Sequence, residues 1–257
     1  MNNFFTSFPS YSNFSPIANF GILFVFLLTN LFSVWILGDV PWLASLSIGI
    51  SGFLMLFYSR SKKLLFTYIV FSLAGAFQEI FFISFGIWSY KDTSFFSIPL
   101  YLPFIWGNIS ILCISFFKGI FMVKPFSFLL HKPPRFFILV VTLSFAIIFS
   151  LASIFFFWEH VILLFLLFIL IDIFLIYMVR SIPFALVGIT ALLCGSLGDL
   201  VSVATERWSY SVGGTVFGVP PYIFIGWDIV GLFIIALYLT LEAFEKERLH
   251  LHKKEVF

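Results

Sequence analysis

The sequence predicts an all-α polytopic membrane protein of about eight transmembrane helices, arranged as two parallel four-helix repeats. Three observations predict this fold class. The composition is 61% apolar and only 10% charged, whereas a soluble globular domain carries about 25% charged residues. A pattern of glycine, acid, tryptophan and tyrosine occurs twice. Finally, the basic residues are divided unevenly between the connections of the apolar segments.

Each expected helix is a continuous apolar run of roughly 20 residues, the length that crosses the hydrocarbon core of a bilayer. Continuous rather than alternating runs favour helices over a barrel, because a spanning helix satisfies its own backbone polar groups. In chain order, the eight expected helices cover residues 18–38, 41–58, 64–86, 99–123, 136–157, 160–179, 184–205 and 220–243.

The 14 lysines and arginines predict the orientation of these helices. Only Lys91 and Arg207 fall on one side, and the other twelve fall on the opposite side or in the C-terminal tail. Cytoplasmic loops are enriched in Lys and Arg, so both termini are expected in the cytoplasm. Orientation also explains the basic residues, so no nucleic-acid partner is expected. The twelve are Arg60, Lys62, Lys63, Lys118, Lys124, Lys132, Arg135, Arg180, Lys246, Arg248, Lys253 and Lys254.

The repeated pattern indicates an internal duplication. The first copy reads Gly75-x3-Glu79-x8-Trp88-Ser89-Tyr90, then Pro99-x-Tyr101-Leu102-x3-Trp106. The second copy reads Gly195-x3-Asp199-x8-Trp208-Ser209-Tyr210, then Pro220-x-Tyr222-Ile223-x3-Trp227. The offset is 120 residues before the loop and 121 after it, which places a one-residue insertion in the second loop. The duplication divides the chain into repeats 1–125 and 126–257, joined by the proline-containing cytoplasmic segment from Lys124 to Arg135.

An even number of helices in each repeat gives both repeats one orientation, so an axis along the membrane normal would relate them. The third helix of each repeat then runs outward to Trp-Ser-Tyr, and the fourth starts at Pro99 or Pro220, because a proline in the first turn leaves no required N–H missing. At about 1.5 Å per residue, Glu79 and Asp199 lie roughly 10 Å below the outer boundary. Trp106, Asn108, Trp227 and Asp228 lie at nearly the same depth, so a shared cavity walled by Trp106, Trp227 and Asp228 is expected.

An ionisable side chain inside a membrane helix is costly, which makes the repeated acids functional candidates. A carboxyl group in an apolar pocket can stay protonated at neutral pH and donate its proton to an alkene, while indole faces stabilise the resulting carbocation. A second carboxylate can then remove a proton, giving cyclisation or isomerisation, or activate water, giving hydration. The expected catalytic residues are Glu79, Asp199 and Asp228. The expected substrate-binding residues are Trp88, Tyr90, Tyr101, Trp106, Asn108, Trp208, Tyr210, Tyr222 and Trp227.

Simpler roles compete with several of these assignments. A buried acid can serve only as a hydrogen-bonding contact between helices, and this leaves the role of the deeper Asp172 open. The tryptophans and tyrosines of Trp-Ser-Tyr also fit an aromatic belt at the membrane surface. Glu206 and Arg207 are expected to form a solvated loop pair. The scattered histidines, the lack of Cys-x-x-Cys and the lack of a phosphate-binding loop predict no metal and no cofactor.

The two copies of the pattern resemble membrane carotenoid-modifying families, namely the lycopene cyclases of the heterodimer or fusion type and the carotenoid hydratases. The resemblance rests on Glu79, Gly86-Ile87-Trp88-Ser89-Tyr90 and Ile98-Pro99 in the first copy, and on Asp199, Trp208-Ser209-Tyr210, Phe217-Gly218-Val219-Pro220 and Trp227 in the second. The cyclases carry Pro-x-Glu-Glu after the loop, whereas this chain has Leu100-Tyr101-Leu102 and Pro221-Tyr222-Ile223. The resemblance therefore implies a hydratase-like or other terpenoid-cyclising relative.

Together these features predict an enzyme of a bacterial or archaeal cell membrane that acts on a lipophilic isoprenoid- or carotenoid-type substrate among the membrane lipids. Two other classes of function remain open. A proton-coupled transporter of a small molecule or lipid would also place carboxylates at a repeat interface. A non-catalytic lipid-binding subunit would explain the aromatic residues and would not need the acids. The sequence leaves the substrate, the product and the oligomeric state undetermined.

Overall fold

The computed structural model describes residues 16–94, 96–122, 136–179, 182–213 and 215–255. These residues form an all-α protein of eight helices with one two-stranded sheet. All eight expected helices are present, with ends shifted by a few residues apart from the last helix, which continues into the C-terminal tail. The helices are α1 (Pro16–Leu37), α2 (Pro41–Ser59), α3 (Lys62–Ser84), α4 (Leu102–Met122), α6 (Phe136–Phe157), α7 (Val161–Val179), α8 (Ile182–Ala204) and α9 (Pro221–Glu255). The strands are β1 (Trp88–Tyr90) and β2 (Trp208–Tyr210).

Length and composition make the chain an integral membrane protein. Among the described residues, six helices are long and apolar enough to cross a membrane, and α1 and α7 contain the shorter apolar stretches Gly21–Leu37 and Val161–Tyr177. Large apolar side chains also cover the outside of the bundle, where Phe77 and Ile162 are 72% and 76% exposed. Such surfaces are stable against lipid and unfavourable against water.

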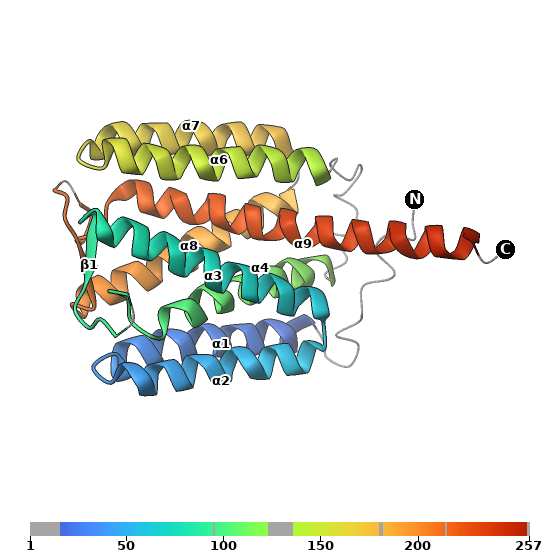
Figure 1. The fold of residues 1–257 in the computed structure, drawn as a ribbon, viewed down its shortest axis with the longest axis horizontal. Coiled ribbons are helices and arrows are strands. Elements are labelled where there is room, and N and C mark those ends of the chain that lie inside the picture. Colours follow the sequence, from blue (N-terminus) through green and yellow to red (C-terminus); the bar gives the residue numbers. More distant parts are fainter. Residues whose placement is uncertain (1–15, 95, 123–135, 180–181, 214, 256–257) are drawn as a thin grey trace.

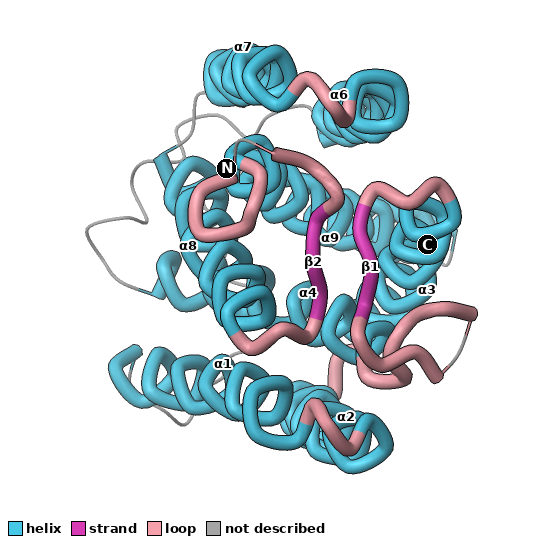
Figure 2. Tube along the Cα trace, turned by 90° about the vertical axis from the view of Figure 1, so that its left-hand side faces the viewer, coloured by secondary structure: helices cyan, strands magenta, loops and turns pink. Residues whose placement is uncertain are grey.

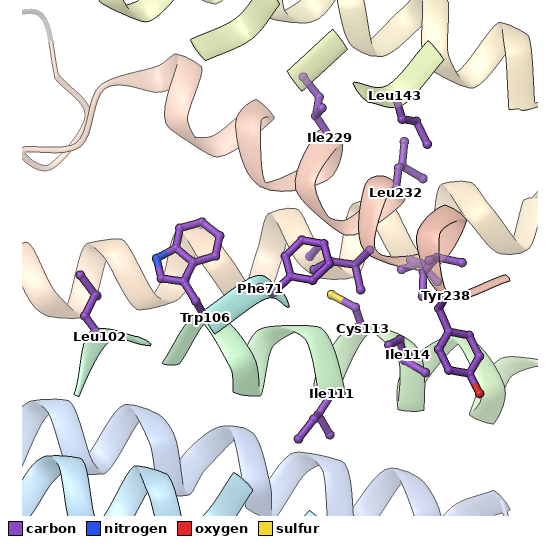
Figure 3. Close-up of a cluster of buried hydrophobic side chains, with 14 of the residues drawn as sticks. Phe71, Leu102, Trp106, Ile111, Cys113, Ile114, Leu143, Ile229, Leu232 and Tyr238 are labelled. Atoms are coloured by element: carbon purple, nitrogen blue, oxygen red, sulfur yellow. The ribbon is translucent and has the colours of Figure 1, made fainter. Parts of the chain in front are cut away.

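The centre of the bundle is formed by α4 and α9 (Figures 1 and 2). Helix α4 contacts α1, α2 and α3, and α9 contacts α6, α7 and α8 in the same way. The α1–α2 and α6–α7 pairs lie on opposite sides of this centre (Figure 1). Figure 3 shows the buried side chains between the layers: in this view Phe71 lies between Trp106 and Cys113, and Leu143 of α6 approaches Leu232 of α9. The segment from Lys124 to Arg135 that was expected to join the repeats lies outside the described residues.

The two Trp-Ser-Tyr segments pair as antiparallel strands, which the sequence analysis did not predict. Trp88 lies opposite Tyr210, Ser89 opposite Ser209, and Tyr90 opposite Trp208. The aromatic side chains of β1 are buried and Ser89 is exposed, because successive side chains of a strand point to opposite faces. The two strands lie side by side across the end of the bundle (Figure 2).

The loops of the two halves follow the same backbone course. Positive φ angles occur at Gly86 (69°) and Glu206 (57°), which are 120 residues apart. They occur again at Phe96 (46°) and Phe217 (51°), and at Ser97 (66°) and Gly218 (84°), which are 121 residues apart. Residues other than glycine and asparagine rarely adopt such angles. Three matched pairs therefore place the change from one offset to the other within the loop after the strands, as the sequence predicts.

Two local expectations are wrong. Pro99 and Pro220 precede their helices instead of occupying the first turn, and their carbonyl oxygens accept bonds from the N–H groups of Leu102 (3.1 Å) and Ile223 (3.0 Å). The first-turn prolines are Pro103 and Pro221. Each fourth helix carries two nearby prolines, and the sequence alone did not show which one is inside the helix.

Arg207 is not part of a solvated pair with Glu206. It is 5% exposed and binds Asp39, in the loop between α1 and α2, through both terminal nitrogens. One of these nitrogens also donates to the carbonyl oxygen of Trp35 at 3.2 Å. Arg207 therefore ties the start of β2 to the end of α1.

Candidate functional site

Glu79 lies inside α3 at the centre of an aromatic cluster. It is 7% exposed and accepts three hydrogen bonds from aromatic side chains. Trp88 Nε1 and the Tyr90 hydroxyl both donate to Glu79 Oε2 at 2.8 Å, and Trp106 Nε1 donates to Oε1 at 3.3 Å. A buried polar group is stable when such partners replace water. Glu79 thus connects α3, β1 and α4.

Asp199 occupies the equivalent position on α8 and is 5% exposed. Trp227 Nε1 donates to Asp199 Oδ2 at 2.6 Å, and the Tyr210 hydroxyl donates to Oδ1 at 3.3 Å. Asp199 and Glu79 both line the same cavity. The duplicated pattern therefore brings its two acids into one site between the halves.

The glycine of each pattern creates the space that brings acid and indole together. A Cβ at Gly75 would collide with the indole of Trp106, and one at Gly195 would collide with the indole of Trp227. Each glycine precedes its acid by four residues, about one helical turn, so both lie on the same helix face. The tryptophan of the fourth helix can thus pack against the glycine of the third helix, where its indole nitrogen donates a hydrogen bond to the acid.

The aromatic residues of the two halves also contact one another. The Trp106 and Trp227 rings stack with centroids 5.3 Å apart and an interplanar angle of 27°. Across the sheet, Trp88 packs edge-on against Tyr210 and Tyr90 against Trp208. These strand residues therefore line the site, and an aromatic belt does not describe them. Burial raises the pKa of both Tyr90 and Tyr210 well above the ordinary value of a phenol, so both hydroxyls remain proton donors at neutral pH.

A cavity of about 200 Å³ lies next to the two acids. Its wall is mostly apolar and includes side chains of α1, α3, α4, α6, α8 and α9. Six of the predicted binding residues belong to the wall together with the two acids: Trp88, Tyr90, Trp106, Trp208, Tyr210 and Trp227. Polar wall residues such as Asn30 and Ser150 were not expected from the sequence, although their separation of 120 residues fits the duplication.

Asp228 and Asn108 do not belong to the cavity wall, so the expectation that Asp228 shares this wall is wrong. The reason is the helical repeat. Asp228 follows Trp227, and one step turns a helix by about 100°, so the side chain of Asp228 points in a different direction from the Trp227 indole. Asp228 instead lies on Gly188 and interacts with the carboxyl group of Asp172.

Asn108 connects helices of the first half. Its amide nitrogen donates to Asn30 Oδ1 at 2.7 Å and to the carbonyl oxygen of Ile48 at 3.0 Å. Asn108 thus joins the fourth helix of the first half to α1 and α2.

The predicted binding residues Tyr101 and Tyr222 are also outside the cavity wall. They are 1% and 0% exposed and pack in the core. Burial raises the pKa of Tyr101 to about 12, so its hydroxyl is neutral. Among the described residues, no three His, Cys, Asp or Glu side chains form a group that could hold a metal ion.

Comparisons with known proteins identify a fold and no family. No protein-family model and no curated protein matches the chain. Among solved structures, the crystal structure of a cross-linked MvINS trimer matches with a TM-score of 0.57 and 16% sequence identity. The match covers 70% of this chain and 94% of the MvINS chain. At this identity the likeness extends to the helical fold alone, which this chain shares with MvINS.

Proposed function

We propose that the protein is an intramembrane enzyme that binds a lipophilic, isoprenoid-type lipid in the cavity and acts on it by acid–base catalysis through Glu79 and Asp199. One observation carries the proposal: the duplicated pattern delivers two carboxyl groups and four tryptophans to the wall of one apolar cavity. An apolar wall suits a hydrocarbon chain, and a few convergent polar groups give a site its chemistry.

The chemistry divides between the two acids. One carboxyl group, in its protonated form, transfers its proton to an alkene carbon of the lipid and becomes a carboxylate. The electron-rich indole rings of Trp106 and Trp227 stabilise the carbocation formed at the neighbouring carbon. The second acid, as a carboxylate, then takes a proton. It removes the proton either from an adjacent carbon, which gives an isomer or a ring, or from an attacking water, which gives an alcohol.

Mass spectrometry of lipid extracts tests this function. Cells with the wild-type gene, without the gene, and with Glu79→Gln or Asp199→Asn are compared. Both substitutions keep the shape of the side chain and remove its ability to transfer a proton, so the product should disappear in each while folded protein remains. A product heavier than its precursor by one water indicates hydration, and an isomeric product indicates cyclisation. Normal product levels in both variants would rule out acid catalysis.

A second candidate, lipid binding without catalysis, is favoured by the bonding of Glu79. Both of its oxygens accept bonds from aromatic donors, which is an arrangement that a purely structural acid also requires. In that case purified wild-type protein and the Glu79→Gln variant retain the same co-purifying lipid, and neither changes it chemically.

We also infer that the chain consists of two parallel four-helix repeats related by an axis along the membrane normal, with both termini in the cytoplasm. The matched φ angles and the antiparallel register of β1 and β2 support the axis, and the uneven distribution of basic residues supports the orientation. A reporter that is active only in the cytoplasm should be active when it is fused to the C-terminus. A tag inserted after Lys91 should be accessible from outside the cell. The opposite result would overturn the orientation.

A further inference from the structure

The two halves differ at the cavity wall in the length of the acid. Trp88 Nε1 donates to Glu79, but the equivalent nitrogen of Trp208 is buried and has no hydrogen-bond partner. Asp199 is one methylene shorter than Glu79. Its two oxygens accept hydrogen bonds from Tyr210 and Trp227, the equivalents of Tyr90 and Trp106, and none from Trp208. The shorter side chain thus leaves an indole N–H at the cavity without an acceptor, which is an unfavourable state for a buried donor.

A second difference lies at the residue before the acid. Gln78 in the first half corresponds to Gly198 in the second, and both belong to the cavity wall. A Cβ at Gly198 would meet no atom within 4 Å. The missing side chain at Gly198 and the missing methylene at Asp199 therefore leave room on the same helix, in the cavity that Trp208 also lines.

We propose that this space holds the hydroxyl group of a lipid alcohol whose hydrocarbon chain fills the apolar part of the cavity. An indole N–H only donates and a carboxylate only accepts. A hydroxyl group does both, so its oxygen accepts from Trp208 Nε1 while its O–H donates to Asp199. A hydrocarbon cannot accept the hydrogen bond that Trp208 Nε1 offers. The inference rests on the proposed function only in using the same cavity, and it specifies the class of lipid.

Binding of farnesol to the full-length protein in lipid nanodiscs tests the inference, with quenching of tryptophan fluorescence as the signal. Farnesyl methyl ether is the matched probe, because its oxygen accepts but cannot donate to Asp199. Farnesol should bind about tenfold more tightly than the ether, since a site built around a hydroxyl rejects an analogue that leaves polar groups unpaired. Equal affinities for the two probes, or no binding of farnesol, would overturn the proposal.

Two substitutions rebuild the first-half arrangement in the second half. Asp199→Glu restores the methylene and brings an oxygen to Trp208, and Gly198→Gln restores the side chain that the first half carries. Each should lower the affinity for farnesol to that for the ether. The matched control is Gly213→Gln, on an exposed loop with no atom near its Cβ, which should bind farnesol as wild type does. A tenfold preference that survives both substitutions would contradict the assigned position.

The two proposals fail in different ways. The lipid-extract experiment measures conversion and depends on proton transfer by Glu79 and Asp199. The farnesol experiment measures binding and depends on the room beside Asp199. Loss of the alcohol preference with normal conversion would remove only the hydroxyl site, and an alcohol preference without any conversion would remove only the enzymatic function.

Discussion

The two halves of this protein share a scaffold and differ in how it holds its acid. Each half places a glycine, an acid one turn later, a Trp-Ser-Tyr strand and an indole from the next helix in the same relation. In the first half, Glu79 accepts three aromatic donors. In the second half, Asp199 accepts two and leaves Trp208 without a partner. Two copies of one pattern can thus provide one acid fixed by its surroundings and one with room beside it.

This difference indicates a division of roles. The backbone torsions and the cross-strand pairs relate the halves almost residue by residue, so the shared features belong to the scaffold. The changes at Asp199 and Gly198 lie together on α8, where they face one cavity. We therefore expect substitutions in the scaffold to act equally in both halves, and substitutions at the acids to act unequally.

The largest effect is expected from the glycines that admit the indoles. Gly75→Ala and Gly195→Ala would each force a methyl group into Trp106 or Trp227 and weaken an indole–carboxylate bond, which costs about 3 kcal/mol in the free energy of unfolding. Thermal unfolding in detergent measures the effect as a lower midpoint. Gly198→Ala is the control, because its methyl group meets open space. A large effect in only one half would break the equivalence of the two scaffolds.

A smaller and unequal effect is expected from neutralising the acids. Glu79→Gln should lower the free energy of unfolding by about 2 kcal/mol and Asp199→Asn by about 1 kcal/mol, since the carboxyl group accepts from three donors in the first case and from two in the second. The same unfolding measurement compares the two variants directly. If Asp199→Asn is the more destabilising substitution, the interpretation of Glu79 as the fixed acid is wrong.

The Arg207 contact to Asp39 should contribute less, and its contribution should depend on pH. The equivalent of Arg207 in the first half is Ile87, so the contact exists in one half only. The hydrogen bond from Arg207 lowers the pKa of Asp39 below its ordinary value of 3.8. The ionised carboxylate therefore stabilises the folded protein above that pH, and the contribution disappears as the pH falls through the lowered pKa.

Comparison of wild type with Asp39→Asn tests this contact. The wild type should unfold at the higher temperature near neutral pH, and the gap between the two proteins should narrow as the pH falls below 3.8 and through the lowered pKa of Asp39. Because other acids titrate alike in both proteins, the gap isolates Asp39. A gap that stays constant across this range would show that the ion pair contributes nothing.

The smallest effect is expected on the exposed face of the sheet. The Ser89 and Ser209 hydroxyls lie 3.1 Å apart, where water can replace either partner. Ser89→Ala should change the free energy of unfolding by less than about 0.5 kcal/mol, and Ser209→Ala should match it. An effect that differs between the two serines would show that the strands are not equivalent.

Sequence patterns predicted the helices because the solvent around them is lipid. In lipid, every spanning segment must be apolar and satisfy its own backbone groups, so continuous runs such as 136–157 predict a helix with its ends. Depth along a helix follows from residue counts as well, which is why Glu79, Asp199, Trp106 and Trp227 were expected at one level. The structure places all four on the wall of one cavity.

The direction of a side chain around its helix was harder to predict than its depth. Asp228 was grouped with Trp227 by depth alone, although adjacent residues on a helix point in different directions. The sheet was not expected either, because three residues give too short a pattern to identify a strand, and its pairing joins Trp88 to Tyr210 across more than a hundred residues. Long-range pairing of this kind is set by the packed bundle.

The stacked pair of Trp106 and Trp227 has an optical consequence. Each half contributes one indole, and the rings lie 5.3 Å apart at 27°, so their electronic transitions couple and should produce a paired band of opposite signs in near-ultraviolet circular dichroism. The strength of such coupling depends on ring separation and angle. The paired band should therefore report the relative orientation of the two halves without an added label.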